Sequence, residues 1–236
     1  MGVMKATLIL IGGGEIGNGE TRPVDEKVRS YSSKENPHLL FLGTASGDPE
    51  SYTEAVRSVY GELSCEVEPL SIANETPSPE DLKEALAWAD MMYIGGGNTK
   101  TLIKRLKETG LDQLLLKALN ERENFVLAGL SAGASCWCEA SYADCDIMDG
   151  ISDKMVFLSC LGYLPYVFNP HAQDPSRTAF LEDLKSFHFK TAYSLENDTA
   201  LIIQGKKVVE FFRGYEDKRG WRITKDKNGR LKSQEL

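Results

Sequence analysis

The sequence predicts an α/β fold, with a mainly parallel sheet sandwiched by helices. Short apolar runs alternate with helix-patterned segments through the first half of the chain, an alternation typical of parallel strands joined by crossover helices. Several of these runs end in glycine, asparagine or threonine, as at 12–14, 43–44 and 95–98. Open α/β sheets place their sites at the carboxyl ends of the strands, so we expect a functional site at that edge.

The individual elements follow from the same pattern. Strands are expected at 6–11, 39–42, 65–70, 91–94 and 125–128, and helices at 24–32, 49–61, 79–88 and 99–120, the last broken at Gly110. After about residue 149 the pattern is less regular. A helix over 175–187 precedes strands at 191–195, 199–203 and 206–212, and Gln204-Gly205 predicts a tight hairpin between the last two. Without a repeat or linker, residues 1–236 are expected to form a single domain.

Composition and charge narrow the class of protein. The chain has 236 residues, of which 42% are hydrophobic and 26% charged, and a net charge of −8. This acidity argues against partners such as nucleic acid or a membrane surface, because both require a basic face. Residues 213–236 are locally basic, with eight Lys/Arg against four Asp/Glu, and we interpret them as a solvated edge or tail.

The cysteines and the N-terminal segment indicate a reducing compartment. Five cysteines occur without paired metal-ligand spacing, which favours free thiols and gives no sign of a metal site. The apolar run 6–11 is short for a signal peptide, and no stretch reaches the length of a membrane span. The expected location is cytoplasmic.

The strongest motif is Gly129-Leu130-Ser131-Ala132-Gly133, which fits G-x-S-x-G. It follows an apolar strand and precedes a plausible helix, as a nucleophile elbow requires. Small neighbours are needed there, because the turn that lifts the serine hydroxyl leaves no room for flanking side chains. The start of the helix supplies free N–H groups where an oxyanion would form. A glycine turn that only packs is the alternative.

A serine nucleophile needs a general base and a group that orients it. Of the three histidines, His171 is best placed, because it follows Asn169-Pro170 at the start of a loop. The carboxylates that could orient it are Asp174, Glu182, Glu196 and Asp198. Glu196 is modestly favoured, since it stands at the end of an expected strand.

Four segments together resemble the peptidase E family of aspartyl dipeptidases, which also includes cyanophycinase. They are Tyr-Ile-Gly-Gly-Gly-Asn-Thr at 93–99, Gly-Leu-Ser-Ala-Gly-Ala at 129–134, Asn-Pro-His at 169–171 and Leu-Glu-Asn at 195–197. Their order and approximate spacing are similar to the family's. The resemblance implies a three-layer α/β sandwich like that of class I glutamine amidotransferases.

The resemblance also implies roles for single residues. Ser131 would be the nucleophile, His171 the general base and acid, and Glu196 the orienting carboxylate. The backbone N–H groups of Gly96 and Ala132 would form the oxyanion hole.

Three further residues are candidates for the substrate site. Asn98 is expected to cap the following helix and shape the glycine loop. The family's aspartyl dipeptidases use an aspartate fifteen residues after the serine, which here is Asp146, although a surface turn fits it equally well. Arg177 is the best-placed cation for an acidic side chain before the scissile bond. Leu130, where the aspartyl dipeptidase has tryptophan, puts a strict Asp-Xaa preference in doubt.

Parts of the sequence also suggest functions other than that of a serine hydrolase. Gly12-x-Gly14-x-x-Gly17 matches the dinucleotide fingerprint, but the next strand ends without the acid that binds ribose. A glutamine amidotransferase would need cysteine at the elbow. A non-catalytic module that binds a small molecule or peptide remains the alternative from another class.

The predicted reaction is acyl transfer through a seryl intermediate, which needs no metal or organic cofactor. The expected substrate is a short peptide, with an Asp-Xaa dipeptide first and a β-aspartyl-arginine peptide second. The sequence leaves open whether the chain pairs into a homodimer through its edge strands.

Overall fold

The computed structural model describes residues 4–236 and contains two sheets. The first has seven strands in the order β11-β10-β1-β5-β4-β2-β3. They comprise β1 (Thr7–Ile11), β2 (His38–Leu42), β3 (Glu66–Pro69), β4 (Met91–Ile94), β5 (Val126–Leu130), β10 (Thr199–Gln204) and β11 (Lys207–Arg213). The five strands from β1 to β3 pair in parallel, and β10 and β11 extend the sheet antiparallel. The confirmed fold class is therefore α/β, but the sheet is mixed.

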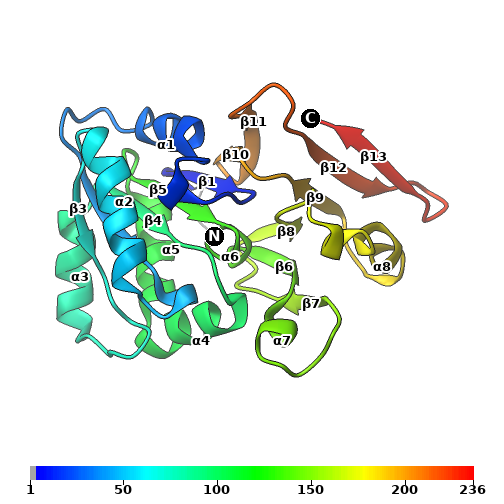
Figure 1. The fold of residues 1–236 in the computed structure, drawn as a ribbon, viewed down its shortest axis with the longest axis horizontal. Helices are drawn as coiled ribbons and strands as arrows, with labels where there is room; N and C mark the ends of the chain where they lie inside the picture. Colours follow the sequence, from blue (N-terminus) through cyan, green and yellow to red (C-terminus); the bar gives the residue numbers. More distant parts are fainter. Residues whose placement is uncertain (1–3) are drawn as a thin grey trace.

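Helices cover both faces of this sheet (Figure 1). They are α1 (Arg22–Arg29), α2 (Glu50–Glu62), α3 (Pro79–Trp88), α4 (Thr99–Thr109) and α5 (Leu111–Glu121). Side chains alternate along a strand, so Leu8 and Leu10 of β1 pack with the apolar faces of α3, α4 and α5, while Ile9 and Ile11 pack with α1 and α2. This division gives the three layers.

A second sheet lies beside the first, on the right of Figure 1. Its six strands run in the order β13-β12-β9-β8-β6-β7. They are β6 (Cys138–Ala143), β7 (Val156–Ser159), β8 (Leu164–Asn169), β9 (Thr191–Leu195), β12 (Gly220–Lys225) and β13 (Leu231–Glu235). Helix α8 (Phe180–Ser186) packs its Phe180 and Leu184 on this sheet. Trp137, Phe168 and Leu195 belong to the same core as α3–α5, so the two sheets share one hydrophobic interior.

The sequence patterns predicted all seven strands of the first sheet and, of the second sheet, the strand β9. The expected break at Gly110 is confirmed, since this glycine has φ 74° and separates α4 from α5. The hairpin after β10 is also confirmed, with Gly205 and Lys206, both at positive φ, at its turn. The expectation that all strands belong to one sheet was wrong, because the strand at 191–195 lies in the second sheet. The basic C-terminal stretch forms β12 and the edge strand β13.

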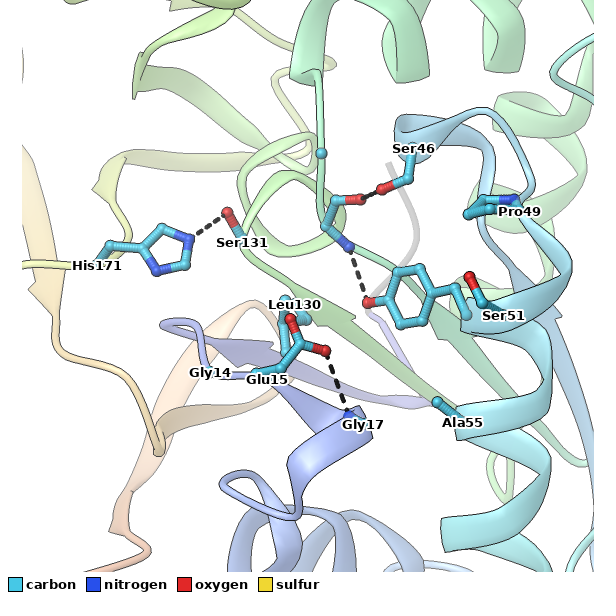
Figure 2. A pocket seen from close by; sticks show the side chains of 13 residues that line it. Gly14, Glu15, Gly17, Ser46, Pro49, Ser51, Ala55, Leu130, Ser131 and His171 are labelled. Carbon is cyan, nitrogen blue, oxygen red and sulfur yellow. Dashed lines mark hydrogen bonds between the residues drawn. The ribbon is translucent and has the colours of Figure 1, made fainter.

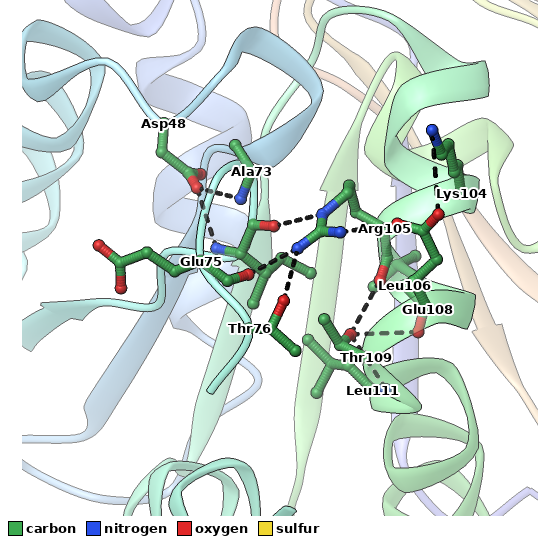
Figure 3. Close-up of polar contacts among 11 residues, drawn as sticks. Asp48, Ala73, Glu75, Thr76, Lys104, Arg105, Leu106, Glu108, Thr109 and Leu111 are labelled. Atoms are coloured by element: carbon green, nitrogen blue, oxygen red, sulfur yellow. Dashed lines mark hydrogen bonds and ion pairs between the residues drawn. The ribbon is translucent and has the colours of Figure 1, made fainter. Parts of the chain in front are cut away.

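Polar contacts connect the loop after β2, the loop after β3 and helix α4 (Figure 3). Asp48 follows the short 3-10 turn η2 (Thr44–Ser46), and its carboxylate accepts the N–H groups of Ile72 (3.0 Å) and Ala73 (2.8 Å). Arg105 of α4 donates from the other side to the carbonyl oxygens of Ile72 and Glu75. Asp48 thus links the turn η2 to the segment 72–73, and Arg105 links that segment in turn to α4.

Candidate active site

Ser131 occupies a sharp turn between β5 and the short helix α6 (Ala132–Ser135). Its backbone has φ 53° and ψ −105°, a strained conformation for a residue with a side chain. A Cβ on Gly129 would lie 2.0 Å from the Gly133 carbonyl oxygen, and one on Gly133 would lie 2.1 Å from the Ile94 carbonyl oxygen. The expectation that only small residues fit around the serine is confirmed, although the helix that follows has only four residues.

His171 lies against the serine from the second sheet. It follows β8, and its Nε2 lies 2.8 Å from Ser131 Oγ. His171 also has positive φ, 51°, and its N–H donates to the Gly12 carbonyl oxygen after β1. A hydroxyl and an imidazole at this distance are the minimum arrangement for proton transfer from a serine nucleophile.

Asn197, rather than Glu196, contacts the other side of the imidazole. Asn197 Oδ1 lies 2.8 Å from His171 Nδ1, so Nδ1 carries the proton and Nε2 is free to accept one. Glu196 instead turns toward the second sheet, where its Oε2 accepts the N–H of Arg219 (2.8 Å). The structure therefore places Asn197, and not the expected Glu196, beside the imidazole. A neutral amide in this position has a chemical precedent in Cys-His-Asn proteases.

The glycine run after β1 is explained by this pair. A Cβ on Gly13 would lie 2.3 Å from His171 Nδ1 and 2.4 Å from Asn197 Oδ1. Gly13 and Gly14 also have φ of 153° and 123°, where side chains are rarely found. The glycine run that matched a dinucleotide fingerprint therefore packs its backbone directly against the side chains of His171 and Asn197.

The two expected oxyanion donors lie beside the serine. Ala132 is the first residue of α6, so its N–H has no acceptor within the helix. A Cβ on Gly96 would lie 3.4 Å from Ser131 Cβ, but the Gly96 N–H donates to the Tyr52 hydroxyl at 3.2 Å. A substrate oxygen would therefore share or replace this phenol as the acceptor of the Gly96 N–H.

A pocket of about 510 Å³ opens in front of Ser131 and His171 (Figure 2). Its other walls come from the loop after β1, from η2 and the start of α2, and from the glycine loop after β4. The lining side chains and backbone belong to Gly14, Glu15, Gly17, Ser46, Pro49, Ser51, Tyr52, Ala55, Gly96, Gly97 and Leu130. The volume fits a short peptide better than a folded protein segment.

Burial keeps the imidazole neutral at physiological pH. The pKa of His171 is lowered from its ordinary 6.5, first because burial disfavours the charged ring and further because of the nearby Arg177 charge. The hydrogen bond that Nδ1 donates to Asn197 Oδ1 and the charges of Asp144 and Asp174 raise the pKa. A neutral ring is the form that can accept the serine proton.

Two of the expected substrate residues are placed outside the pocket. Asn98 accepts the Thr101 N–H at the start of α4, as expected for a cap, and donates to Asp149 (2.8 Å). Asp146, in α7 (Cys145–Met148), pairs with Lys100 at 3.3 Å. Neither residue lines the pocket, so these two polar groups organise the loops behind the glycine run.

Arg177 does not lie where a cation that binds an acidic substrate side chain was expected. Its side chain is buried, and Nη1 donates to the Tyr142 carbonyl oxygen (2.6 Å) and to Asn169 Oδ1 (3.3 Å). Nη2 lies 3.6 Å from Asp144 Oδ2. The guanidinium thus holds the ends of β6 and β8 together behind His171, and it does not line the pocket that contains Ser131.

Sequence reasoning missed three residues at this site: Asn197, Tyr52 and Glu15. Asn197 was adjacent to a candidate and inside a quoted motif, so its amide could have been weighed as an orienting group. Tyr52 lies in a helix that carries no motif, and Glu15 is a variable position of the glycine run 12–17, so only the fold brings them to the pocket of the serine.

Residues 4–236 contain no cluster of three or more His, Cys, Asp or Glu side chains arranged to hold a metal ion. Within the same range no helix combines the length and apolar character that crossing a membrane requires.

Comparison with known proteins assigns the family. The chain is 31% identical over 203 residues to the uncharacterized peptidase YgaJ of Bacillus subtilis, covering 84% of this chain and 83% of YgaJ. It is 26% identical over 180 residues to a probable alpha-aspartyl dipeptidase of Drosophila melanogaster, covering 72% and 71%. It is also 30% identical over 137 residues to peptidase E of Streptomyces coelicolor, covering 58% and 52%.

Solved structures share the fold. A peptidase from an acI-B1 actinobacterium superposes with a TM-score of 0.67 at 18% identity, covering all of this chain and 96% of that one. A Listeria monocytogenes protein provisionally described as peptidase E also gives 0.67 at 24% identity, with coverage of 89% and 98%. The model of peptidase family S51 matches residues 8–211. Since that match spans most of the 236 residues, the chain belongs to peptidase family S51.

Proposed function

We propose that this peptidase is a serine peptidase that hydrolyses short peptides, with Ser131 as nucleophile and His171 as general base. The observation that carries the proposal is the 2.8 Å separation of Ser131 Oγ and His171 Nε2 at a strained strand-to-helix turn. Asn197 supports it, because an acceptor on Nδ1 selects the tautomer in which Nε2 can take a proton.

The mechanism follows from these positions. His171 removes the proton of Ser131 as Oγ attacks the peptide carbonyl carbon, and the ring then protonates the departing amine. Water, activated by the same nitrogen, releases the acyl group and restores the serine. The amide of Asn197 keeps the ring in place through both transfers, although it offers the imidazolium less charge stabilisation than a carboxylate would.

The negative charge on the carbonyl oxygen needs donors beside Ser131. We assign this role to the backbone N–H groups of Ala132 and Gly96. The Ala132 N–H has the added benefit of a helix start, and each such donor is worth roughly 10²–10³ in rate. The Tyr52 hydroxyl, which holds the Gly96 N–H in the free protein, would give way to the substrate oxygen.

The proposal is tested by labelling with a fluorophosphonate and by a panel of dipeptides with aspartyl, glutamyl, alanyl and β-aspartyl first residues. The wild type should be labelled at Ser131 and should hydrolyse part of the panel. Ser131→Ala should do neither. Ser58→Ala removes an exposed serine of α2 that does not line the pocket, and it should keep both activities. A folded wild-type protein that reacts with neither reagent would refute a serine mechanism and favour the binding module.

A further inference from the structure

The pocket in front of Ser131 has an unusual charge for a site that would bind an aspartyl side chain. Among the described residues that line it, Glu15 is the one acidic side chain, and none is lysine or arginine. His171 adds no positive charge when neutral, which its lowered pKa favours. A bound aspartate side chain would therefore meet the negative charge of Glu15 and no lysine or arginine among the described lining residues.

Glu15 is held at the pocket wall by its own loop. Its N–H donates to Glu20 Oε2 (3.0 Å), and its Oε1 accepts the Gly17 N–H (3.3 Å). Within residues 4–236 its second oxygen, Oε2, has no hydrogen-bond partner. Figure 2 shows the carboxylate beside Leu130, with its hydrogen bond to the Gly17 N–H dashed.

The cations that could reverse this charge are engaged elsewhere. Arg177 is buried behind His171, with its Nη1 donating to Tyr142 and Asn169. Lys100 pairs with Asp146 at 3.3 Å. Arg177 was the cation expected to meet an acidic substrate, and neither Arg177 nor Lys100 lines the pocket. The electrostatics of the pocket thus favour a ligand that brings its own positive charge.

We propose that Glu15 binds a cationic nitrogen in the acyl half of the peptide substrate, so that the enzyme selects peptides with a positive charge next to the scissile bond and disfavours an aspartyl residue there. This inference rests on the proposed serine mechanism and names its substrate class. The cation has two chemical sources, the free α-ammonium group of the first residue or a basic side chain.

Four p-nitroanilides separate these sources: those of alanine, N-acetyl-alanine, N-acetyl-lysine and aspartate. If the α-ammonium binds Glu15, acetylation of the alanine substrate lowers kcat/KM and N-acetyl-lysine does not restore it. If a basic side chain binds, N-acetyl-lysine exceeds N-acetyl-alanine. In both cases the aspartate substrate is slower than the alanine substrate.

The variant Glu15→Gln keeps the size of the side chain and removes its charge. It should lower kcat/KM for the preferred cationic substrate roughly fivefold to tenfold, with little effect on N-acetyl-alanine p-nitroanilide. The difference should shrink as salt is raised. Glu84→Gln removes an equal charge from the exposed face of α3, outside the pocket, and should change nothing.

Two results would overturn the inference while leaving the serine mechanism intact. In the first, Ser131 is labelled by the fluorophosphonate and Glu15→Gln has the same preferences as the wild type. In the second, the labelled enzyme prefers the aspartate substrate or cleaves none of the four. Loss of labelling in the wild type would instead reject the proposed function, and the inference with it.

Discussion

His171 Nδ1 lies 2.8 Å from Asn197 Oδ1, so an amide and not a carboxylate orients the imidazole that faces Ser131. The backbone of Asn197 is itself held, since its N–H donates to the side chain of Gln173 (3.0 Å). Glu196, one residue earlier, bonds to Arg219 in the second sheet. The two neighbours therefore have separable roles, which mutation can distinguish.

Asn197→Ala should lower kcat by about 10²-fold, because the ring loses its tautomer and its orientation. Asn197→Asp keeps an acceptor for Nδ1 and should retain most of the activity. Steady-state kinetics with the best substrate of the panel measures both.

Glu196→Gln is the control for this pair. Its amide oxygen can still accept the Arg219 N–H, so kcat should stay within about twofold of the wild type. A loss at Glu196 as large as that at Asn197 would show that the carboxylate moves to the imidazole during the reaction.

Gly13→Ala should disrupt the site and also lower the free energy of unfolding, because a side chain at φ 153° is strained. The added Cβ would lie 2.3 Å from His171 Nδ1, and a displacement of about 1 Å at a catalytic group costs on the order of 10²-fold in rate. The readout is kcat/KM together with the midpoint of urea unfolding.

Gly110→Ala provides the comparison. This glycine also has positive φ, 74°, but no atom lies within 4 Å of the position that a Cβ would occupy. It should lose about 1 kcal/mol of stability from backbone strain and keep its activity.

The pH dependence of fluorophosphonate labelling should report His171 directly. The pKa of the ring is below 6.5 because it is buried, so the labelling rate should fall only as pH drops below that value. The Asn197 hydrogen bond raises this pKa, and in Asn197→Ala the acid limb should shift to still lower pH. A limb above 6.5 would contradict the burial argument.

The lowered pKa of His171 also makes the free energy of unfolding depend on pH. Below pH 6.5 the unfolded chain binds a proton at this histidine before the folded protein does. Stability therefore rises with pH through the window between the folded pKa and 6.5, and it is lost as pH falls through that window. His171→Gln should remove this contribution from the pH dependence of the unfolding free energy.

Arg177→Leu should destabilise the protein without changing which first residue is preferred. The substitution leaves the Tyr142 carbonyl oxygen and Asn169 Oδ1 buried without this donor, which costs about 2 kcal/mol. Arg57→Leu, on α2, removes a half-exposed side chain whose ion pair is with Glu54 on the same helix, and it should change the unfolding free energy by less than about 0.5 kcal/mol. If Arg177→Leu changed the preference for an aspartyl first residue, Arg177 would have to contact the substrate.

Local patterns sufficed for the first sheet and for the serine and histidine. The elbow motif is a local requirement of a strand-to-helix turn, so Ser131 could be found from five residues. His171 could be ranked because Asn169-Pro170 ends a strand. The second sheet was missed because β6 is rich in small residues and β13 is polar, and neither gives the apolar run that indicates a strand.

The remaining wrong expectations concern side chains whose positions depend on contacts between distant segments of the chain. The direction of Glu196 is set by the strand β12, which the sequence did not reveal. The burial of Arg177 depends on a carbonyl group 35 residues earlier in the chain. Patterns along a sequence report which residues share a face, but they do not report which acceptor will lie opposite a given side chain.

The histidine comes to the serine from the second sheet, and Asn197 lies where the chain passes from β9 in that sheet to β10 in the first. Neither sheet alone can bring these groups together, and the contacts span 40 and 26 residues of chain. Catalytic competence should therefore be among the last properties to return when the denatured chain refolds. A refolding intermediate with native helix content and no reactivity toward fluorophosphonate would be one in which the first sheet has formed and the second has not yet docked.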